Sequence, residues 1–336
     1  MRSVLAVVLM SCLPLMSMAQ PLAKAEKKAY DDPALAAKTI DFQMQGEYVG
    51  EVQSEKGDKG SIGVQVIAKG DGKFQAVMFL GGLPGDGGQM KSRIAIDGEL
   101  DGEQVVFKND RGILTINGDT LTANDANGKV GWQIKKTERT SPTIGAKPPA
   151  GATVLFDGKK ETFEKNWAKG ARMTDDGLLM EGCNSLASFT DFKLHIEFRL
   201  PFQPFASGQQ RGNSGIYFQG RHEVQMLDSF GLLGKDNECG GIYTVKAPDV
   251  NMCLPPLAWQ TYDADFTAAR FDSEGKKTAS ARITIKHNGV VIHDNVEVPK
   301  STTASPKKEG AEPGPIYLQN HGNPVRYRNI WIEPKQ

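Results

Sequence analysis

The chain has 336 residues, with 40 acidic and 40 basic side chains and a hydrophobic fraction of 39%. This length is sufficient for two domains with substantial cores. Because the charges balance, the composition gives no sign of nucleic acid or an anionic membrane surface as a partner. No segment after the first twenty residues approaches the roughly twenty apolar residues that a bilayer-spanning helix needs, so we expect no transmembrane segment.

The first 19 residues have the features of a signal peptide. Arg2 precedes an apolar run, and residues 17–19 include the small side chains that signal peptidase requires. We predict cleavage after Ala19 and export to the periplasm or the medium. In an alternative interpretation residues 9–12 form a lipoprotein box anchored at Cys12, although the apolar segment before Cys12 is short. Residues 20–40 read as an exposed N-terminal segment with one short helix at 33–38.

Residues 41–137 show short alternating segments typical of an antiparallel β domain. We count about seven strands, which would form a small sandwich or a partly open barrel. Turn pairs such as Asp97-Gly98, Asp101-Gly102 and Asn117-Gly118 explain the many aspartates, because these pairs adopt the backbone that tight hairpins need. No spaced acidic loop indicates a calcium site.

Residues 138–150 have the proline, serine and glycine content of an interdomain linker, so we expect proteases to cut there first. Residues 151–336 form a second strand-rich region. Its segment 192–199 alternates strictly between apolar and charged side chains, and 281–298 reads as a hairpin closed by Asn288-Gly289. No sustained helical period is present. The pattern predicts an all-β protein whose C-terminal domain is a two-sheet sandwich preceded by a smaller antiparallel β domain.

The segment 213–228, NSGIYFQGRHEVQMLD, predicts a hairpin with one apolar and one polar face. A loop with an odd number of residues keeps the two polar sets on the same side, and it would set Gln219 opposite Glu223 and Tyr217 opposite Gln225. The polar face then combines an aromatic ring, amides and one carboxylate, which suits a sugar ligand. The alternative is an ordinary solvated outer face.

Five segments in order carry a family resemblance. They are LFDGKKETFEKNW from Leu155, NSGIYFQGRHEVQMLDSFG, NECGGIY, NMCLPPLAWQTYD and YLQNHGNPVRYRNIWI. Together they resemble the 3-keto-disaccharide hydrolase family over about residues 151–335. The resemblance implies a concanavalin A-like jelly roll and a carbohydrate substrate already oxidised at C3. It implies cleavage by removal of the C2 proton, elimination of the glycosidic oxygen and hydration.

In such a jelly roll the ligand groove lies along one sheet, which makes the polar hairpin face its floor. Glu223 and His321 are the predicted proton-transfer pair, with the roles of acid and base unassigned. Glu223 could instead be a solvated residue or an ion-pair partner of Arg221, and His321 a loop residue that bonds backbone. The predicted substrate-binding residues are Asn213, Tyr217, Gln219, Arg221, Gln225, Lys246 and Gln319. Arg221, Lys246 or a bound divalent metal ion would stabilise the enolate, and the sequence specifies no other cofactor.

Three cysteines remain after the predicted cleavage. In an exported protein, Cys239 and Cys253 are expected to form a disulfide, because they flank a short excursion beside the groove. Cys183 is then the unpaired one and is expected to be buried. Neither CxxC nor HxxxH spacing is present, which argues against a zinc site.

Two other functions compete with this prediction. A jelly roll can be a sugar-binding module without catalysis, since fold does not imply function. A retaining glycosidase needs two neighbouring carboxylates, commonly on one strand as E-x-D-x-E. Here the matching positions are Glu223, Gln225 and Leu227, so the second carboxylate is missing, and Glu197 could supply it only from another strand.

Overall fold

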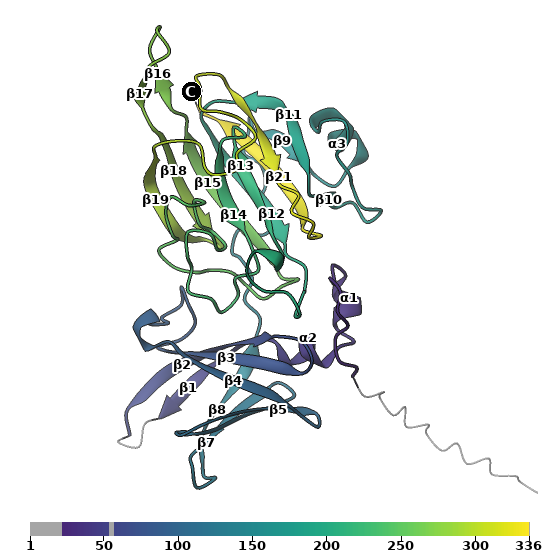
Figure 1. The fold of residues 1–336 in the computed structure, drawn as a ribbon, viewed down its shortest axis with the longest axis vertical. Coiled ribbons are helices and arrows are strands. Elements are labelled where there is room, and N and C mark those ends of the chain that lie inside the picture. The colour runs from purple at the N-terminus through teal and green to yellow at the C-terminus, as the bar shows by residue number, and fades with distance from the viewer. Residues whose placement is uncertain (1–21, 54–56, 336) are drawn as a thin grey trace, which may run out of the picture.

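A computed structural model describes residues 22–53 and 57–335, which form a β-barrel followed by a β-sandwich (Figure 1). The predicted signal peptide and Cys12 lie outside the described residues. Within those residues, no helix has both the length and the apolar character that crossing a membrane requires. The prediction of an all-β chain is confirmed.

The N-terminal segment holds the two short helices α1 (Pro33–Ala36) and α2 (Ile40–Met44). Each begins at a side-chain cap: Asp32 accepts from the Ala34 amide, and Thr39 accepts from the Phe42 amide. At the start of each helix, one backbone amide therefore has a side-chain acceptor.

The barrel is closed and contains eight antiparallel strands in chain order, where the sequence predicted about seven strands and partial closure. The additional strand is the first one, whose alternation Gly46 and Gly50 interrupt. Its pairing with the last strand closes the barrel. The strands are β1 (Gly46–Gln53), β2 (Lys59–Ala68), β3 (Lys73–Leu80), β4 (Ile94–Asp101), β5 (Gln104–Asn109), β6 (Gly112–Asn117), β7 (Thr120–Asn124) and β8 (Val130–Thr137), with the 3-10 turn η1 (Met90–Ser92) before β4.

The sandwich consists of a seven-stranded and a four-stranded antiparallel sheet. The large sheet holds, in spatial order, β10 (Leu179–Met180), β21 (Arg326–Pro334), β12 (Phe192–Arg199), β15 (Trp259–Thr267), β18 (Ala281–His287) and β19 (Val290–Val298), and β9 (Thr153–Phe156) also pairs with β21. The small sheet holds β11 (Cys183–Phe189), β20 (Gly314–Leu318), β13 (Ser214–Phe218) and β14 (His222–Met226). A ribbon of β16 (Arg270–Phe271) and β17 (Lys277–Ala279), helix α3 (Lys160–Asn166) and the 3-10 turn η2 (Gly208–Gln210) complete the domain.

The core of the sandwich lies between its two sheets and continues into the barrel. Ile216, Phe218 and Val224 of the small sheet join Phe192 and Phe266 of the large sheet in one buried cluster. The same cluster includes three barrel side chains, Ile67, Val77 and Phe79. The barrel therefore packs on the sandwich through an apolar contact and is not joined to it by the linker alone.

The predicted linker lies against the outer face of the large sheet. Between the end of β8 and the start of β9, the Thr143 hydroxyl donates to Asp263 at 2.7 Å, and the Gly145 amide donates to Glu197 at 2.6 Å. The indole of Trp331 donates to the Ala146 carbonyl at 3.2 Å. These bonds to side chains of the sheet hold the segment in place, so composition alone did not predict its packing.

The predicted disulfide between Cys239 and Cys253 is not formed, and Cys183 is free as well. All three thiols are buried. Cys239 and Cys253 lie close enough for their side chains to hydrogen-bond, and the Cys239 sulfur also contacts the Tyr262 hydroxyl at 3.3 Å. The excursion between them is held instead by backbone bonds to β14, among them Tyr243 N to Glu223 O at 3.1 Å.

Candidate active site

The hairpin of β13 and β14 has the predicted odd-length loop, but its register differs by one pair. Tyr217 lies opposite Glu223, and Gly215 lies opposite Gln225. The three loop residues are 219–221, and Gln219 has a positive φ of 56°. Because an odd loop preserves which residues share a face, Tyr217, Glu223 and Gln225 still point to the same side.

A row of four side chains crosses the small sheet on the face turned away from the core. Successive strands pair Asn184 with Tyr317, Tyr317 with Tyr217, and Tyr217 with Glu223. We call these four residues the central row. The rings of Tyr217 and Tyr317 lie 5.5 Å apart between centroids. The row thus ends in a carboxylate on β14, with aromatic rings beside it.

Glu223 is 2% exposed and is hydrogen-bonded to one side chain, Tyr217, whose hydroxyl donates to Oε2 at 2.7 Å. Burial raises the pKa of the Glu223 carboxyl to about 7, although the bond from Tyr217 opposes the shift. Burial beside this carboxyl also raises the pKa of the Tyr217 hydroxyl. A carboxyl with such a pKa exchanges protons readily near neutral pH, which suits general acid–base chemistry.

The backbone around Glu223 is held on both sides. Its amide donates to the Thr302 hydroxyl at 2.9 Å, and its carbonyl accepts from Tyr243 N. Gln319 Nε2 donates to the Tyr217 hydroxyl at 3.1 Å, which continues the chain of hydrogen bonds from Glu223 to β20. These bonds fix the carboxyl without placing a cation against it.

Gly215 makes room for the carboxylate. A Cβ atom at this position would lie 2.2 Å from Glu223 Oε1, which is far inside van der Waals contact. The Glu223 side chain therefore leans over the Gly215 backbone on the neighbouring strand. We conclude that a side chain at residue 215 would push the carboxyl from its position.

The amide side chains of Asn213 and Gln225, on the hairpin, contact a third amide, that of Gln209. Gln225 is 1% exposed, and its Nε2 donates to Gln209 Oε1 at 3.1 Å. Asn213 is also 1% exposed, and its Nδ2 donates to the same oxygen at 3.1 Å. Gln209 Nε2 in turn donates to the Asn237 carbonyl at 2.8 Å. The predicted ligand residues Asn213 and Gln225 therefore meet at Gln209 on η2.

The structure places Arg221 and Gln219 away from the central row. The Arg221 guanidinium donates to the carbonyls of Lys308 and Glu312 at 2.8 and 2.9 Å, and to Gln219 Oε1 at 3.3 Å. Gln219 Nε2 donates to the Phe189 carbonyl. Both side chains thus fasten the hairpin turn to neighbouring loops, and Arg221 forms no ion pair with Glu223.

His321 and Lys246 lie nearer the surface. His321 is exposed in the loop that follows Gln319, and within the described residues no hydrogen bond to its ring is present. Lys246 is partly exposed and forms an ion pair with Asp249 at 2.5 Å. The structure therefore leaves Glu223 as the buried titratable member of the predicted proton-transfer pair.

Sequence reasoning missed five residues of this region: Asn184, Gln209, Tyr243, Thr302 and Tyr317. Tyr317 could have been found, because it shares a strand face with the predicted residue Gln319. Gln209, Tyr243 and Thr302 lie in segments without regular alternation, and only the tertiary fold brings them to β14. No local pattern marks such residues.

Glu197 cannot provide the second carboxylate of a retaining glycosidase at this site. It lies on the outer face of the large sheet, where its carboxylate accepts from Gly145 N, Asn329 Nδ2 and Arg328 Nε at 2.6, 2.9 and 2.6 Å. Burial opposes its ionisation, but these bonds and the neighbouring His195 lower the pKa of Glu197 to about 2. Glu197 is therefore charged at neutral pH and acts as a structural residue.

Three strand histidines are buried, although sequence alternation and a neighbouring hairpin turn would favour positions at the surface. His195, His287 and His293 are each 0% exposed. Burial lowers the pKa of His287 to about 3 and that of His293 to about 4, so both are neutral. Burial also opposes the charge on His195, yet bonds to Asp263 and Glu197 raise its pKa above the ordinary value. None of the three belongs to the central row.

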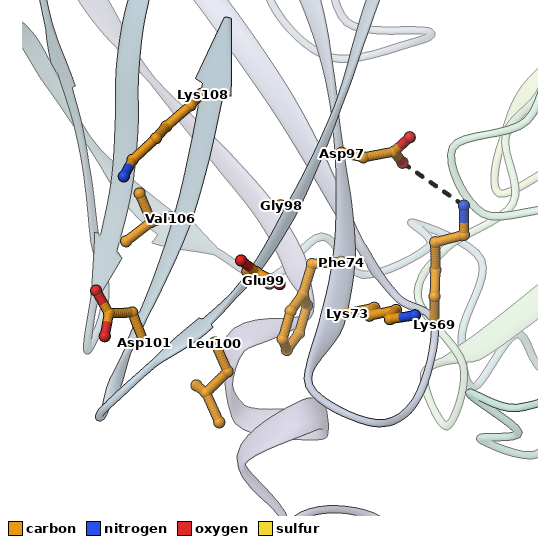
Figure 2. A pocket seen from close by; sticks show the side chains of 10 residues that line it. All are labelled: Lys69, Lys73, Phe74, Asp97, Gly98, Glu99, Leu100, Asp101, Val106 and Lys108. Atoms are coloured by element: carbon orange, nitrogen blue, oxygen red, sulfur yellow. Dashed lines mark ion pairs between the residues drawn. The ribbon is translucent and has the colours of Figure 1, made fainter.

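Residues of both charges line a cavity of about 730 Å³ on the outside of the barrel. Figure 2 shows these residues, of which Lys69 and Asp97 form an ion pair at 3.6 Å. A second cavity, of about 590 Å³, lies between the barrel, the docked linker and Trp259. Neither cavity is lined by a residue of the central row.

The described residues contain no group of three or more His, Cys, Asp or Glu side chains arranged to hold a metal ion. Around Glu223 the neighbours that could contact an ion are amide and hydroxyl groups. We therefore derive no chemical step from a metal.

Comparison with known protein families matches residues 151–333 to the 3-keto-alpha-glucoside-1,2-lyase-like domain. The match covers more than half of the chain and coincides with the sandwich. The chain belongs to this family. The resemblance seen in the sequence is thereby confirmed. The family match supports a carbohydrate hydrolase-like function for this chain.

Two solved structures from Parabacteroides distasonis ATCC 8503, both provisionally assigned as glycosyl hydrolases, match part of this chain. One is 32% identical, with a TM-score of 0.51, and the alignment covers 56% of this chain and 85% of that one. The other is 18% identical, with a TM-score of 0.41 and coverage of 55% and 94%. A search among curated proteins found no match.

Proposed function

We propose that this protein cleaves glycosides whose sugar carries a ketone at C3, and that Glu223 is the base. The ketone acidifies the proton on C2. The Glu223 carboxylate takes this proton, the electrons of the C2–H bond form the enolate, and the C1–oxygen bond then breaks as the C1–C2 double bond forms. Addition of water to that double bond would complete a net hydrolysis.

The observation that carries the proposal is the environment of Glu223. A buried carboxyl with a pKa of about 7 and a tyrosine hydroxyl as its partner is suited to accept and return a proton near neutral pH. A residue that only bound sugar hydroxyls would need no such shift. The family match supplies the class of substrate, because its description names a 3-keto-glucoside lyase.

The remaining roles follow from position. The amide of Gln319, which already donates to Tyr217, is proposed to donate to the C3 oxygen as negative charge develops there. His321 lies two residues further along the chain, in the loop at the end of β20, and is proposed to protonate the leaving oxygen. Lys246, paired with Asp249 at the rim, is proposed to contribute positive potential to the bound enolate.

The test is incubation of the protein with matched disaccharides, one plain and one oxidised at C3. We expect release of the leaving sugar from the 3-keto compound and no release from the plain one. Equal release from both would identify an ordinary glycosidase and contradict the elimination. Binding of the 3-keto compound without any release would identify a sugar-binding module.

A further inference from the structure

The amides of Asn213, Gln225 and Gln209 form a compact polar group at one end of the central row. Asn213 Nδ2 and Gln225 Nε2 both donate to a single oxygen, Gln209 Oε1, each at 3.1 Å. The remaining oxygen of the Asn213 amide, Oδ1, is buried and has no hydrogen-bond partner within the described residues. An unpaired buried acceptor costs free energy, and native proteins rarely keep one without a reason.

Two amide donors that converge on one oxygen, beside an acceptor that lacks a donor, match the requirements of a vicinal diol. One hydroxyl oxygen would accept from Asn213 Nδ2 and Gln225 Nε2. The adjacent hydroxyl would donate to Asn213 Oδ1, so that the amide engages the diol through both of its atoms. In the ligand-free structure Gln209 Oε1 occupies the position of the first hydroxyl, and the second position has no substitute.

The distance to Glu223 decides which part of the substrate fits. Gln225 lies two residues from Glu223 on β14 and on the same face, and successive same-face residues of a strand are separated by roughly 7 Å. That spacing is about one pyranose ring. A sugar held at these amides is therefore next to the ring whose C2 proton Glu223 removes.

Gln209 is placed to act as a removable cover. It lies on the short turn η2 and is partly exposed, and its Nε2 reaches across to the Asn237 carbonyl of a neighbouring loop. The loop that carries it is anchored on both sides of η2. The Arg211 guanidinium donates to the barrel carbonyl of Ala68 at 3.1 Å, and Phe205 lies directly against Gly70 of the barrel. The barrel thus supports the loop, and rotation of the partly exposed Gln209 side chain would break only its own three hydrogen bonds.

We propose that Asn213 and Gln225 form a subsite for the leaving group of the substrate, and that this subsite binds the vicinal diol of a hexopyranose. The inference rests on the function proposed above. It adds which residues bind the leaving sugar, so that loss of the Asn213 donor impairs cleavage of a 3-keto-disaccharide more than cleavage of a glycoside of a flat aromatic alcohol.

The first experiment compares two substrates that share the 3-keto-glucosyl part. One has glucose as its leaving group and the other has a phenol without further hydroxyls. Asn213→Asp keeps the shape and the acceptor but removes the donor of Asn213. We expect it to lower kcat/KM for the disaccharide about tenfold, chiefly through KM, with less than about a twofold change for the phenyl glycoside. An equal loss on both substrates would overturn the subsite.

The control is Gln210→Ala, which removes the exposed side chain next to Gln209 on the same turn. The Gln210 side chain takes no part in the amide group, so this variant should treat both substrates like the wild type. Gln209→Ala removes only the cover, and we expect it to keep or strengthen the preference for the disaccharide. A loss of that preference in Gln209→Ala would contradict the assignment of Gln209 as a cover.

A second measurement is independent of catalysis and separates failure of the subsite from failure of the proposed reaction. Binding of free glucose, the leaving group itself, can be followed by ligand-observed NMR with wild type and Asn213→Asp. We expect wild type to bind glucose more tightly than cyclohexanol, which has one hydroxyl, and Asn213→Asp to lose about tenfold in glucose affinity. If wild type binds both compounds equally, or Asn213→Asp binds glucose as wild type does, the diol subsite is wrong even where 3-keto-glycosides are cleaved.

Discussion

Two glutamates in the sandwich are equally buried, and their surroundings have opposite effects on their pKa. Glu223 is 2% exposed and accepts a side-chain hydrogen bond from one neutral partner, and its pKa rises to about 7. Glu197 is 1% exposed and accepts from a backbone amide, an asparagine and an arginine, and its pKa falls to about 2. Low exposure therefore does not by itself mark a catalytic carboxyl. The desolvation of the carboxyl and the number and charge of its donors together set its pKa.

The two glutamates also differ in role. Glu197 and its partners hold the linker on the outer face of the large sheet. In the described part of the chain, the Glu223 carboxyl accepts a hydrogen bond from one neutral side chain, and the amide oxygen of Asn213 on the same face has no donor. Such incompleteness is expected where a ligand supplies the missing partners.

The largest expected effect comes from Glu223→Gln. This change keeps the size and hydrogen bonding of the side chain but removes its ability to take a proton, so turnover of a 3-keto-disaccharide should fall by about a hundredfold or more. Steady-state rates measure this. Glu197→Gln is the matched control, a buried glutamate given the same substitution, and its turnover should stay within about threefold of wild type where the protein is folded. Nearly full turnover in Glu223→Gln would move the base to His321 and its neighbours.

Glu197→Gln should instead lower the free energy of unfolding by about 1–2 kcal/mol at neutral pH, because it removes the charge to which Gly145, Asn329 and Arg328 donate, while solvent screens the 37% exposed Arg328 side chain. Chemical denaturation measures this loss. Because the folded pKa of Glu197 lies below its ordinary value, the stabilisation is present above about pH 4.5 and disappears as the pH falls toward about 2. A variant as stable as wild type would show that the bonds at Glu197 contribute nothing net.

The docked linker provides a second readout of the same change. In wild type, limited proteolysis should spare residues 141–146, because the bonds from Thr143 and Gly145 hold them against the sheet. In Glu197→Gln the cut between residues 137 and 151 that composition alone predicts should appear. Rapid cleavage there in wild type would contradict the docked arrangement.

Several elements follow from sequence because they depend on local pattern. The alternation in β12 and the parity of the β13–β14 loop determine which side chains share a face, and this was sufficient to predict Tyr217, Glu223 and Gln225 together. The register itself was wrong by one pair, because the positive φ of Gln219 places that residue in the loop. The sequence pattern therefore predicts which side chains share a strand face more reliably than it predicts which residues pair across the hairpin.

Other features depend on tertiary packing and leave no local signal. His195 alternates with charged residues, yet the docked linker buries it completely. Arg221 lies in the hairpin loop, where the sequence predicted a ligand-binding residue. Its guanidinium instead donates to the backbone carbonyls of Lys308 and Glu312, which are distant in sequence. Cys239 and Cys253 flank one excursion as a disulfide would, and the fold leaves them as neighbouring free thiols. Each depends on a segment distant in sequence.

A smaller effect concerns the stability cost of the Glu223 site. Its folded pKa of about 7 lies above the ordinary value of 4.5, so the folded state holds an extra proton between these values and stability falls as the pH rises through this window. Relative to wild type, Glu223→Gln should therefore gain about 2 kcal/mol of unfolding free energy between about pH 5 and about pH 8. Denaturation curves at both pH values measure this gain. A constant difference would show that Glu223 is not shifted.

The most direct test of the central claim is the pH dependence of kcat/KM for cleavage of a 3-keto-disaccharide. If Glu223 is the base, it must be ionised in the free protein, so kcat/KM should rise with pH through an apparent pKa near 7 and level off above it. The small residual activity of Glu223→Gln should lack this step. A step near the ordinary pKa of 4.5, or one near 7 that persists unchanged in Glu223→Gln, would contradict the assignment of Glu223 as the base.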